Sequence, residues 1–288
     1  MATELLALTG GRSLEYLSNG VVSDAAIIFH QGTLADLIGW GSSLSSLADQ
    51  GIRAVSFNRS GYGRSSSLDN RVVLDTGRDV TQILDHLNLT KFVSIGASGG
   101  GPPALATGLD ERCVGVVTVG GLAPFNQPDL DFYAGMKAGD ILEYKTALRD
   151  INEFLEMFGA DGPVTIWCLP DQEALASPAS DEMKAAVAKT YEFGLRCLVD
   201  DYSSYLSPWG FDVEDIEVPV VLFQGALDEN VPPGHGQWLA RKIRNAHLVV
   251  KPEEGHISIW HRCRQEIFET ATRLLTTNMA PRLQQRDL

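Results

Sequence analysis

Long hydrophobic runs are missing from this chain of 288 residues. The most apolar stretch, residues 113–125, is shorter than the ~20 residues of a membrane-spanning helix, and Gly120, Gly121 and Pro124 interrupt it. The first residues also lack the basic start and long apolar centre of a secretory signal. We therefore expect neither a membrane span nor membrane binding, and we expect a cytoplasmic location.

Cysteine and basic side chains are also scarce. The four cysteines are scattered, without the C-x-x-C spacing of a metal site or the density of a disulfide framework, so we expect no metal and a reducing compartment. The 23 Lys and Arg side chains are outnumbered by 37 Asp and Glu, and the resulting net charge of −14 repels nucleic acid and anionic lipid. A small-molecule substrate is the partner class that remains, and the oligomeric state stays open.

The chain does have the composition and length of one large globular domain with an insertion. In its first half, short runs rich in Val and Ile alternate with stretches compatible with helices. Such alternation predicts βαβ units and a mostly parallel sheet that is buried on both faces. The expected strands are residues 25–30, 52–58, 92–97 and 114–119, and the expected helices are residues 40–49, 76–87 and 103–109.

Two segments depart from this alternation. Residues 5–17, around Gly10 and Gly11, predict an antiparallel hairpin at the edge of the sheet. Residues 124–209 are acidic and interrupted by prolines, and they contain no long β-rich run. Apolar residues at three- and four-residue spacing predict helices in this second segment, at residues 142–157 and 181–195.

The alternation resumes after residue 209, and residues 280–288 form a polar tail that we expect to fray. We therefore predict an α/β core domain, residues 1–123 and 210–288, with a helical cap, residues 124–209, inserted between the fourth and fifth parallel strands. The elements expected in the last part of the core are strands at 218–224 and 247–251 and helices at 236–243 and 262–275.

Residues 96–100 match the pattern G-x-S-x-G between a predicted strand and a predicted helix. A nucleophile on such a sharp turn needs strained backbone angles and small neighbours, which glycines provide. The turn would expose the hydroxyl of Ser98 and the amide of Gly99. A glycine-rich turn can also serve tight packing or phosphate binding, but a phosphate loop favours a lysine where this chain has Pro102 and Pro103. We predict that Ser98 is a nucleophile.

A serine hydroxyl needs a base to become a nucleophile at neutral pH. His256 follows the predicted strand 247–251, and loops at the carboxyl ends of parallel strands are where ligands bind. His261, five residues further on, is the reserve candidate. The remaining histidines considered, which lie in or beside predicted helices, have structural or surface roles in this interpretation: His86, His235 and His247.

The base in turn needs an acid that orients it. Asp228 lies in the turn after the predicted strand 218–224, so it reaches the same edge of the sheet. The neighbouring Glu229 is expected to be a solvated loop carboxylate. Asp129 and Asp131, which follow an earlier strand, are weaker substitutes for Asp228.

Taken together, these motifs resemble those of the α/β-hydrolase superfamily, over most of the chain outside the insertion. Residues 30–33 resemble the family's His-Gly turn after the third strand, and residues 58–65 resemble its Asp-Arg-x-Gly-x-Gly-x-Ser segment. The family's order of Ser, Asp and His is also kept by Ser98, Asp228 and His256. Residues 98–102 are similar to those of bacterial relatives of proline iminopeptidases and small esterases.

The resemblance implies a mostly parallel, eight-stranded sheet flanked by helices, with a helical cap. It also implies acyl transfer without a cofactor, in which the amides of Gly99 and Thr33 form the oxyanion hole. Two departures from the pattern are Gln31 in place of the His of the His-Gly turn, and Asn58 in place of Asp. We expect the second to change local hydrogen bonds, and we expect Arg59 beside it to be a structural tie.

Several functions remain compatible with this sequence. The first is a serine hydrolase that cleaves a small-molecule ester or related acyl bond. A cofactorless haloperoxidase, a lyase or a C–C hydrolase would use the same three residues, and a hydrolase-fold receptor would need none of them. An aminopeptidase like proline iminopeptidase would need acids in the cap to bind the ammonium group of its substrate, for which Glu143, Glu153 and Glu156 are available.

Overall fold

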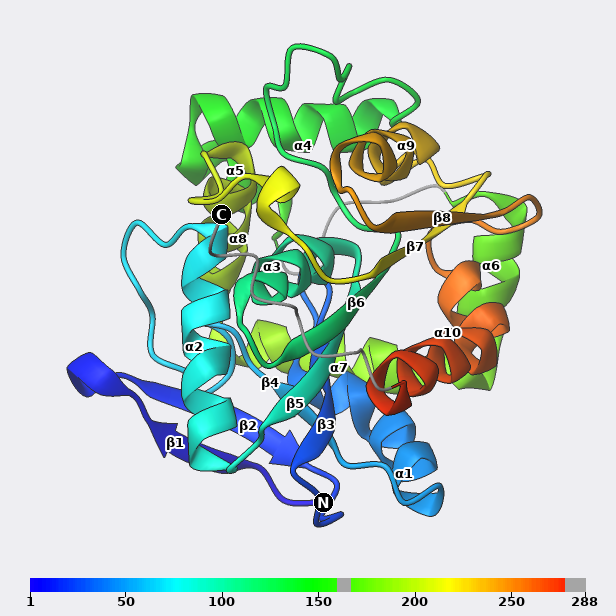
Figure 1. Cartoon of the computed structure of the whole chain (residues 1–288). Helices are drawn as coiled ribbons and strands as arrows, with labels where there is room; N and C mark the ends of the chain where they lie inside the picture. The colour runs from blue at the N-terminus through cyan, green and yellow to red at the C-terminus, as the bar shows by residue number, and fades with distance from the viewer. Residues whose placement is uncertain (160–166, 278–288) are drawn as a thin grey trace, which may run out of the picture.

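The computed structural model describes residues 1–159 and 167–277. These residues form one sheet of eight strands in the order β1-β2-β4-β3-β5-β6-β7-β8 (Figure 1). Strand β2 pairs in antiparallel fashion with β1 on one side and with β4 on the other, and all other neighbours are parallel. The strands are β1 (Glu4–Ala7), β2 (Ser13–Ser18), β3 (Ala25–His30), β4 (Ala54–Phe57), β5 (Lys91–Ala97), β6 (Cys113–Val119), β7 (Val220–Gly225) and β8 (Ala246–Lys251).

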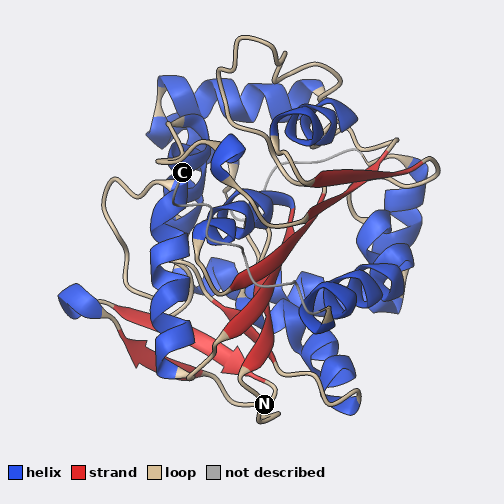
Figure 2. Cartoon of the chain, in the orientation of Figure 1, coloured by secondary structure: helices blue, strands red, loops and turns tan. Residues whose placement is uncertain are grey.

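Helices cover both faces of this sheet, as the continuous apolar strands predict (Figure 2). Alternate residues of β3 enter two separate cores: Ile27 and Phe29 pack with the helices on one face, and Ile28 packs with those on the other. The mostly parallel, eight-stranded sheet flanked by helices is thus confirmed. The first face carries α1 (Gly41–Asp49) and α10 (Ser258–Thr276), and the second carries α2 (Val73–His86), α3 (Gly101–Ala106) and α9 (Pro233–Lys242).

The edge hairpin predicted for residues 5–17 is formed by β1 and β2, which meet at a short turn where Gly10 and Gly11 both have positive φ. This turn and several other connections contain single 3₁₀ turns. These are η1 (Thr9–Gly11), η2 (Leu37–Trp40), η3 (Ser98–Gly100), η4 (Thr107–Leu109), η5 (Pro178–Ser180) and η6 (Val213–Asp215).

The connection between β6 and β7 contains helices and, within its described residues, no strand. The single helix predicted for residues 142–157 is wrong. The chain breaks at Asp150, whose side chain accepts hydrogen bonds from the amides of Asn152 and Glu153 and so starts a new helix. The inserted helices are α4 (Ala138–Arg149), α5 (Ile151–Met157), α6 (Leu169–Ala176), α7 (Asp181–Phe193) and α8 (Arg196–Leu206).

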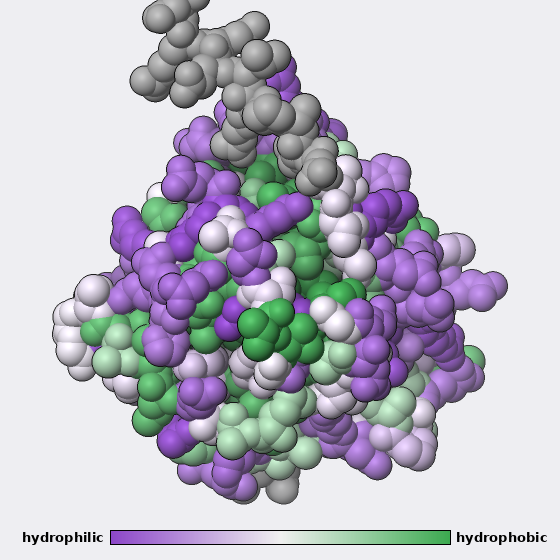
Figure 3. All heavy atoms as spheres, turned by 60° about the horizontal axis from the view of Figure 1, so that its bottom comes forward, coloured by the Kyte–Doolittle hydropathy of each residue, from purple (hydrophilic) through white to green (hydrophobic). Residues whose placement is uncertain are grey.

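The division into a core (1–123 and 210–288) and a cap (124–209) stays a prediction. Residues 160–166 of the predicted cap and the predicted polar tail, 280–288, lie outside the described residues. In the described part of the chain, no helix is long and apolar enough to cross a membrane. Figure 3 shows one face of the molecule, on which hydrophilic and hydrophobic side chains are interspersed.

Candidate active site

Ser98 lies in the sharp turn that joins β5 to η3 and α3. Its φ of 51° lies in the left-handed region, which a residue other than glycine rarely adopts. The turn is tight enough that a Cβ atom at Gly96 would collide with the carbonyl oxygen of Gly100. A Cβ at Gly100 would in turn collide with the carbonyl oxygen of His30 in β3. The glycines of the motif therefore allow β5 to turn directly into a helix while the serine side chain stands above the sheet.

The structure brings His256 and Asp228 to this serine. His256 lies in the loop between β8 and α10, and its Nε2 is 2.8 Å from Oγ of Ser98. Its Nδ1 is 2.7 Å from Oδ2 of Asp228, in the turn after β7. Because a carboxylate can only accept, Nδ1–H donates to Asp228, which leaves Nε2 of the neutral ring to accept the hydroxyl proton of Ser98.

Asp228 is buried, and backbone amides hold its second oxygen. The amides of Asn230 and Val231 donate to Oδ1 at 2.9 and 2.8 Å. Gly120, which follows the last residue of β6, lies close to both side chains and has a φ of 57°. A Cβ there would lie 3.1 Å from Nδ1 of His256 and 3.2 Å from Oδ2 of Asp228, so a side chain would press on both.

The surroundings of His256 favour its charged form. Burial alone lowers the pKa of an imidazole, but the charge and hydrogen bond of Asp228, together with the charges of Asp171 and Asp140, outweigh burial. The net result is that the pKa of His256 is raised above its usual value. Such a histidine can hold a proton taken from Ser98, which is what a general base must do.

Gly99 and Thr33 lie side by side next to Ser98. A Cβ at Gly99 would be 3.1 Å from the amide nitrogen of Thr33, and it would collide with the threonine hydroxyl. Gly99 stands in the first helical turn, where amides have no carbonyl partner within the helix. Within the described residues, the amide of Thr33 also donates to no protein acceptor. The hydroxyl of Tyr205 joins the two turns, since it donates to the carbonyl of Gly99 at 2.7 Å and lies 3.4 Å from Oγ1 of Thr33.

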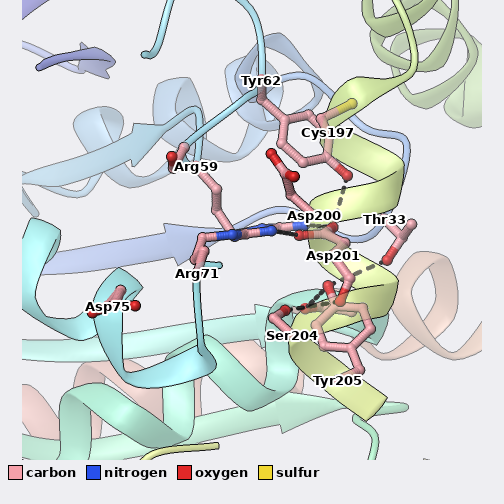
Figure 4. A network of polar contacts seen from close by, with 12 residues as sticks. Thr33, Arg59, Tyr62, Arg71, Asp75, Cys197, Asp200, Asp201, Ser204 and Tyr205 are labelled. Atoms are coloured by element: carbon pink, nitrogen blue, oxygen red, sulfur yellow. Dashed lines mark hydrogen bonds and ion pairs between the residues drawn. The ribbon is translucent and has the colours of Figure 1, made fainter. Parts of the chain in front are cut away.

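A buried ion cluster lies close to Thr33 and Tyr205 (Figure 4). Asp201 of α8 is fully buried and pairs with the guanidinium groups of Arg59 and Arg71. Tyr62 donates to Asp201 at 2.7 Å, and Arg59 donates to the carbonyl of Gln31, two residues before Thr33. Burial would raise the pKa of Asp201, but the charges of Arg59 and Arg71 lower it below its usual value. The cluster therefore ties α8 to the chain around the predicted oxyanion hole.

A cavity of about 880 Å³ is lined by Ser98, Gly99, Thr33 and His256. Most of its other walls are apolar or aromatic, and the inserted helices supply many of them. Glu143 of α4 is one of the acidic side chains that line it. Burial first, and Asp140 second, raise the pKa of Glu143 to about 7 against a hydrogen bond from Tyr202. Aromatic lining residues are Trp40, Tyr144, Phe158, Trp167, Tyr191, Tyr202 and Trp260.

The other sequence candidates lie elsewhere or make other contacts. His261, the reserve base, lines the cavity from α10 but has no hydrogen bond to Ser98. Glu229 is exposed, as expected. Asp129 accepts a hydrogen bond from Trp238 at 2.8 Å, and exposed Asp131 accepts one from the amide of Tyr133. None of these carboxylates is bonded to His256 in the described residues.

Asn58 and Arg59 make the local contacts expected of them. The amide oxygen of Asn58 accepts from the backbone of Leu37 at 2.9 Å, and its nitrogen donates to Asp36 at 2.8 Å and to Glu15 at 3.1 Å. An asparagine suits position 58 because its side-chain NH₂ group donates to both of these carboxylates. Arg59 is the structural tie to Asp201 described above.

Three residues that contact this site belong to no motif visible in the sequence: Asp171, Asp201 and Tyr205. Asp171 accepts hydrogen bonds from the loop that carries His256, and the other two hold the turns at Thr33 and Gly99. Asp201 and Tyr205 are four residues apart and so share one face of a helix. This spacing is the only local signal that links any of them.

Comparison with known proteins agrees with this architecture. The model of the α/β hydrolase fold family matches residues 25–262. A non-heme haloperoxidase from Rhodococcus erythropolis is 25% identical over 244 residues, which are 81% of this chain and 86% of that protein. The 3-oxoadipate enol-lactonase 1 of Acinetobacter baylyi is 33% identical over 99 residues, 34% of this chain and 37% of the enzyme, so the match spans little more than a third of its length.

The solved structure of an esterase from Exiguobacterium antarcticum has the same fold. It aligns with a TM-score of 0.71 at 18% identity, and the alignment covers 96% of this chain and 100% of the esterase. The strand order, the sharp serine turn between β5 and α3 and the family match over residues 25–262 lead to one conclusion. The chain belongs to the α/β-hydrolase fold family.

Proposed function

We propose that this protein is a serine hydrolase that cleaves a small-molecule ester or a related acyl bond. The observation that carries the proposal is the continuous series of hydrogen bonds from Asp228 through His256 to Ser98, with the serine facing a cavity of about 880 Å³. Ser98 is the proposed nucleophile, His256 the general base and Asp228 the group that orients the base. This constellation is what activates a serine hydroxyl in acyl transfer.

In the first step of the proposed reaction, Oγ of Ser98 attacks the carbonyl carbon while Nε2 of His256 takes the hydroxyl proton. Asp228 stabilises the resulting imidazolium. The negative charge that develops on the carbonyl oxygen would be bound by the amides of Gly99 and Thr33, which are adjacent and unengaged. His256 then gives its proton to the departing alcohol, and the acyl group stays on Ser98.

Water completes the cycle. His256 takes a proton from the water as it attacks the acyl carbon, and the proton then passes to Oγ of Ser98 as the acid leaves. All of these steps use groups of this chain and water. We propose that residues 124–209 act as the cap over the cavity, and that the protein works in the cytoplasm, as its scattered cysteines suggest.

Substitution of the serine tests this proposal. We expect Ser98→Ala to lower kcat for p-nitrophenyl acetate or butyrate by roughly 10⁴-fold or more, with an unchanged unfolding midpoint, because the nucleophile is lost and the packing is kept. A fluorophosphonate probe should label the unmodified protein and fail to label the variant. A variant that keeps its rate and its labelling would end the serine-hydrolase proposal. An unmodified protein that neither turns over these esters nor reacts with the probe would favour the receptor alternative.

Aminopeptidase activity is the second candidate, because one of the acids it requires lines the cavity. Glu143 lies in the wall, whereas Glu153 forms an exposed pair with Arg149. An N-terminal ammonium group beside Glu143 would favour the carboxylate form of that side chain. Turnover of proline p-nitroanilide above that of p-nitrophenyl butyrate, and its loss in Glu143→Gln, would select this candidate.

The haloperoxidase, lyase and C–C hydrolase alternatives use the same three side chains, so the site geometry does not separate them from an esterase. Substrates separate them. Carbon–carbon diketones and a halide assay with peroxide, compared with an ester panel, would show which bond is broken fastest. Under this proposal, we expect the ester substrates to be cleaved fastest.

A further inference from the structure

Helix α6 brings a buried carboxylate to the loop that carries His256. Asp171, in the first turn of α6, is only 2% exposed. Its Oδ2 accepts the amide of His256 at 2.8 Å, and its Oδ1 accepts the amides of Ile257 and Ser258 at 2.9 and 2.8 Å. One side chain therefore binds three consecutive amides, the first of which belongs to the proposed base.

These amides stand at the amino end of α10, where backbone N–H groups have no carbonyl partner within the helix. A carboxylate is well placed there because the helix dipole makes this end positive. The approach is close: a Cβ at Gly255 would collide with Oδ2 of Asp171 and with Sγ of Cys168. The peptide that precedes His256 thus lies directly against α6, and its position depends on the carboxylate.

Asp171 also acts on the imidazole through its charge. The groups that raise the pKa of His256 are Asp228 after β7, Asp171 on α6 and Asp140 on α4, and burial opposes them. Asp171 is the one among them that also binds the backbone of His256 in the described residues. It does not line the cavity, so it has no direct access to a substrate.

We propose that Asp171 is a positioning residue for the base, and that through it the inserted helix α6 sets where the imidazole of His256 stands relative to Ser98. This inference rests on the proposed function, since it needs His256 to act as the base. The carboxylate fixes the start of α10 and the loop before it, and thereby keeps Nε2 within 2.8 Å of Oγ of Ser98.

Asp171→Asn tests the proposal with little change in volume. An asparagine has a single acceptor oxygen, so its NH₂ group must face at least one of the three amides, donor against donor. We expect kcat to fall roughly tenfold to a hundredfold with little change in KM, as displaced catalytic groups produce. The acid limb of the profile of kcat/KM against pH should also move to lower pH, because one negative charge beside His256 is gone.

Glu173→Gln is the matched control. Glu173 lies on the same helix and pairs with Arg262 of α10 at 2.6 Å, but both side chains are exposed and neither contacts His256. This variant loosens the same packing of α6 on α10 but leaves Asp171 and the three amides that it binds unchanged. We expect its kcat and its acid limb to match those of the unmodified protein.

The outcomes separate this proposal from the function on which it rests. If Ser98→Ala is inactive while Asp171→Asn matches Glu173→Gln in both kcat and acid limb, Asp171 only caps a helix and the positioning role is wrong. A lowered unfolding midpoint alone would also support only capping. If Ser98→Ala keeps its activity, the proposed function fails first.

A second variant keeps the test decisive if Asp171→Asn does not fold. Asp171→Glu keeps the charge and both acceptor oxygens but adds a methylene group that must displace the loop. We expect lower kcat with the acid limb unchanged. A folded Asp171→Glu protein with the kcat of the unmodified protein would count against positioning. So would a variant in which a shift of the acid limb accounts for the whole loss of activity.

Discussion

Helices α8 and α6 each carry a buried aspartate to the sheet, but the two carboxylates meet different partners. Asp201 of α8 pairs with two guanidinium groups, of Arg59 and Arg71, and donors from the core loops complete the cluster. In the part of the chain that the structure describes, Asp171 of α6 has no cation among its hydrogen-bond partners and binds three backbone amides instead. One contact balances charge, and the other fixes the course of the main chain.

This difference gives the two inserted helices different expected roles. Removing one member of a buried ion pair leaves an uncompensated charge, so the α8 contact should matter mainly for stability. Backbone amides carry no net charge, so loss of the α6 contact should matter mainly for the placement of His256. The two sides of the site, the oxyanion turns and the base, are therefore expected to respond differently to equivalent substitutions.

The largest effect that separates the two contacts should come from Asp201→Asn. It leaves Arg59 and Arg71 buried and positively charged without a counterion, so the free energy of unfolding should fall by about 3–5 kcal/mol. Urea unfolding followed by circular dichroism measures this change. Asp200→Asn is the matched control on the same helix, because Asp200 is also buried but pairs with the exposed guanidinium of Arg196, at 3.0 Å. Its loss leaves no buried cation unpaired, so it should cost at most about 1 kcal/mol. If both variants lost the same free energy of unfolding, the Asp201 cluster would have no special role in stability. The proposed difference between α8 and α6 would then fail.

A smaller effect is expected from Tyr205→Phe. The variant keeps the ring but removes the hydroxyl that donates to the carbonyl of Gly99. An unpaired buried acceptor costs about 1–3 kcal/mol, and if part of this cost appears as misplacement of the Gly99 amide, kcat should fall roughly tenfold with KM nearly constant.

Ser204→Ala controls for this change. Among the described residues, its hydroxyl donates only to the carbonyl of Asp201 within the same helix, at 2.8 Å. Steady-state kinetics on p-nitrophenyl butyrate compare the two variants. A Tyr205→Phe enzyme as fast as Ser204→Ala would mean that α8 does not support the oxyanion turns.

The smallest effect concerns the pH dependence of the unmodified protein. A general base works in its neutral form, so kcat/KM should be constant at high pH and fall as the pH drops through the pKa of His256. Burial lowers that pKa, but Asp228, Asp171 and Asp140 together raise it by more than burial lowers it. The midpoint should therefore lie above the usual value of about 6.5. A profile of kcat/KM from pH 5 to 9 measures it. A rate that stays flat down to pH ~5 would point to another base.

Local patterns predicted much of the fold because its strands are buried on both faces. The runs at 25–30 and 114–119 are continuous and apolar, and they form β3 and β6 within one residue of the expected bounds. The inserted helices were harder to predict, since each packs over only part of its surface. The break between α4 and α5 depends on Asp150, a residue type that also occurs inside helices.

The candidate site was predictable where a residue type and its neighbours carry the signal. The glycines around Ser98 indicate a strained turn. Asp228 and His256 each follow a strand, so the edge of the sheet at which they meet could be inferred. Their distances to one another required the folded chain. Their catalytic roles stay a proposal that the variants above test.

Apolar periodicity, glycine spacing and the order of strands and helices are properties of neighbouring residues, and from them the sequence alone determined the layered sheet and the serine turn. Contacts across long separations were decided only by the tertiary structure: Asp171 reaches an amide 85 positions away, and Arg59 reaches Asp201 across 142. The physical reason lies in the partners. Every residue other than proline offers the same amide donor, and any of 23 cations could pair with a given carboxylate, so only packing selects the partner that is near.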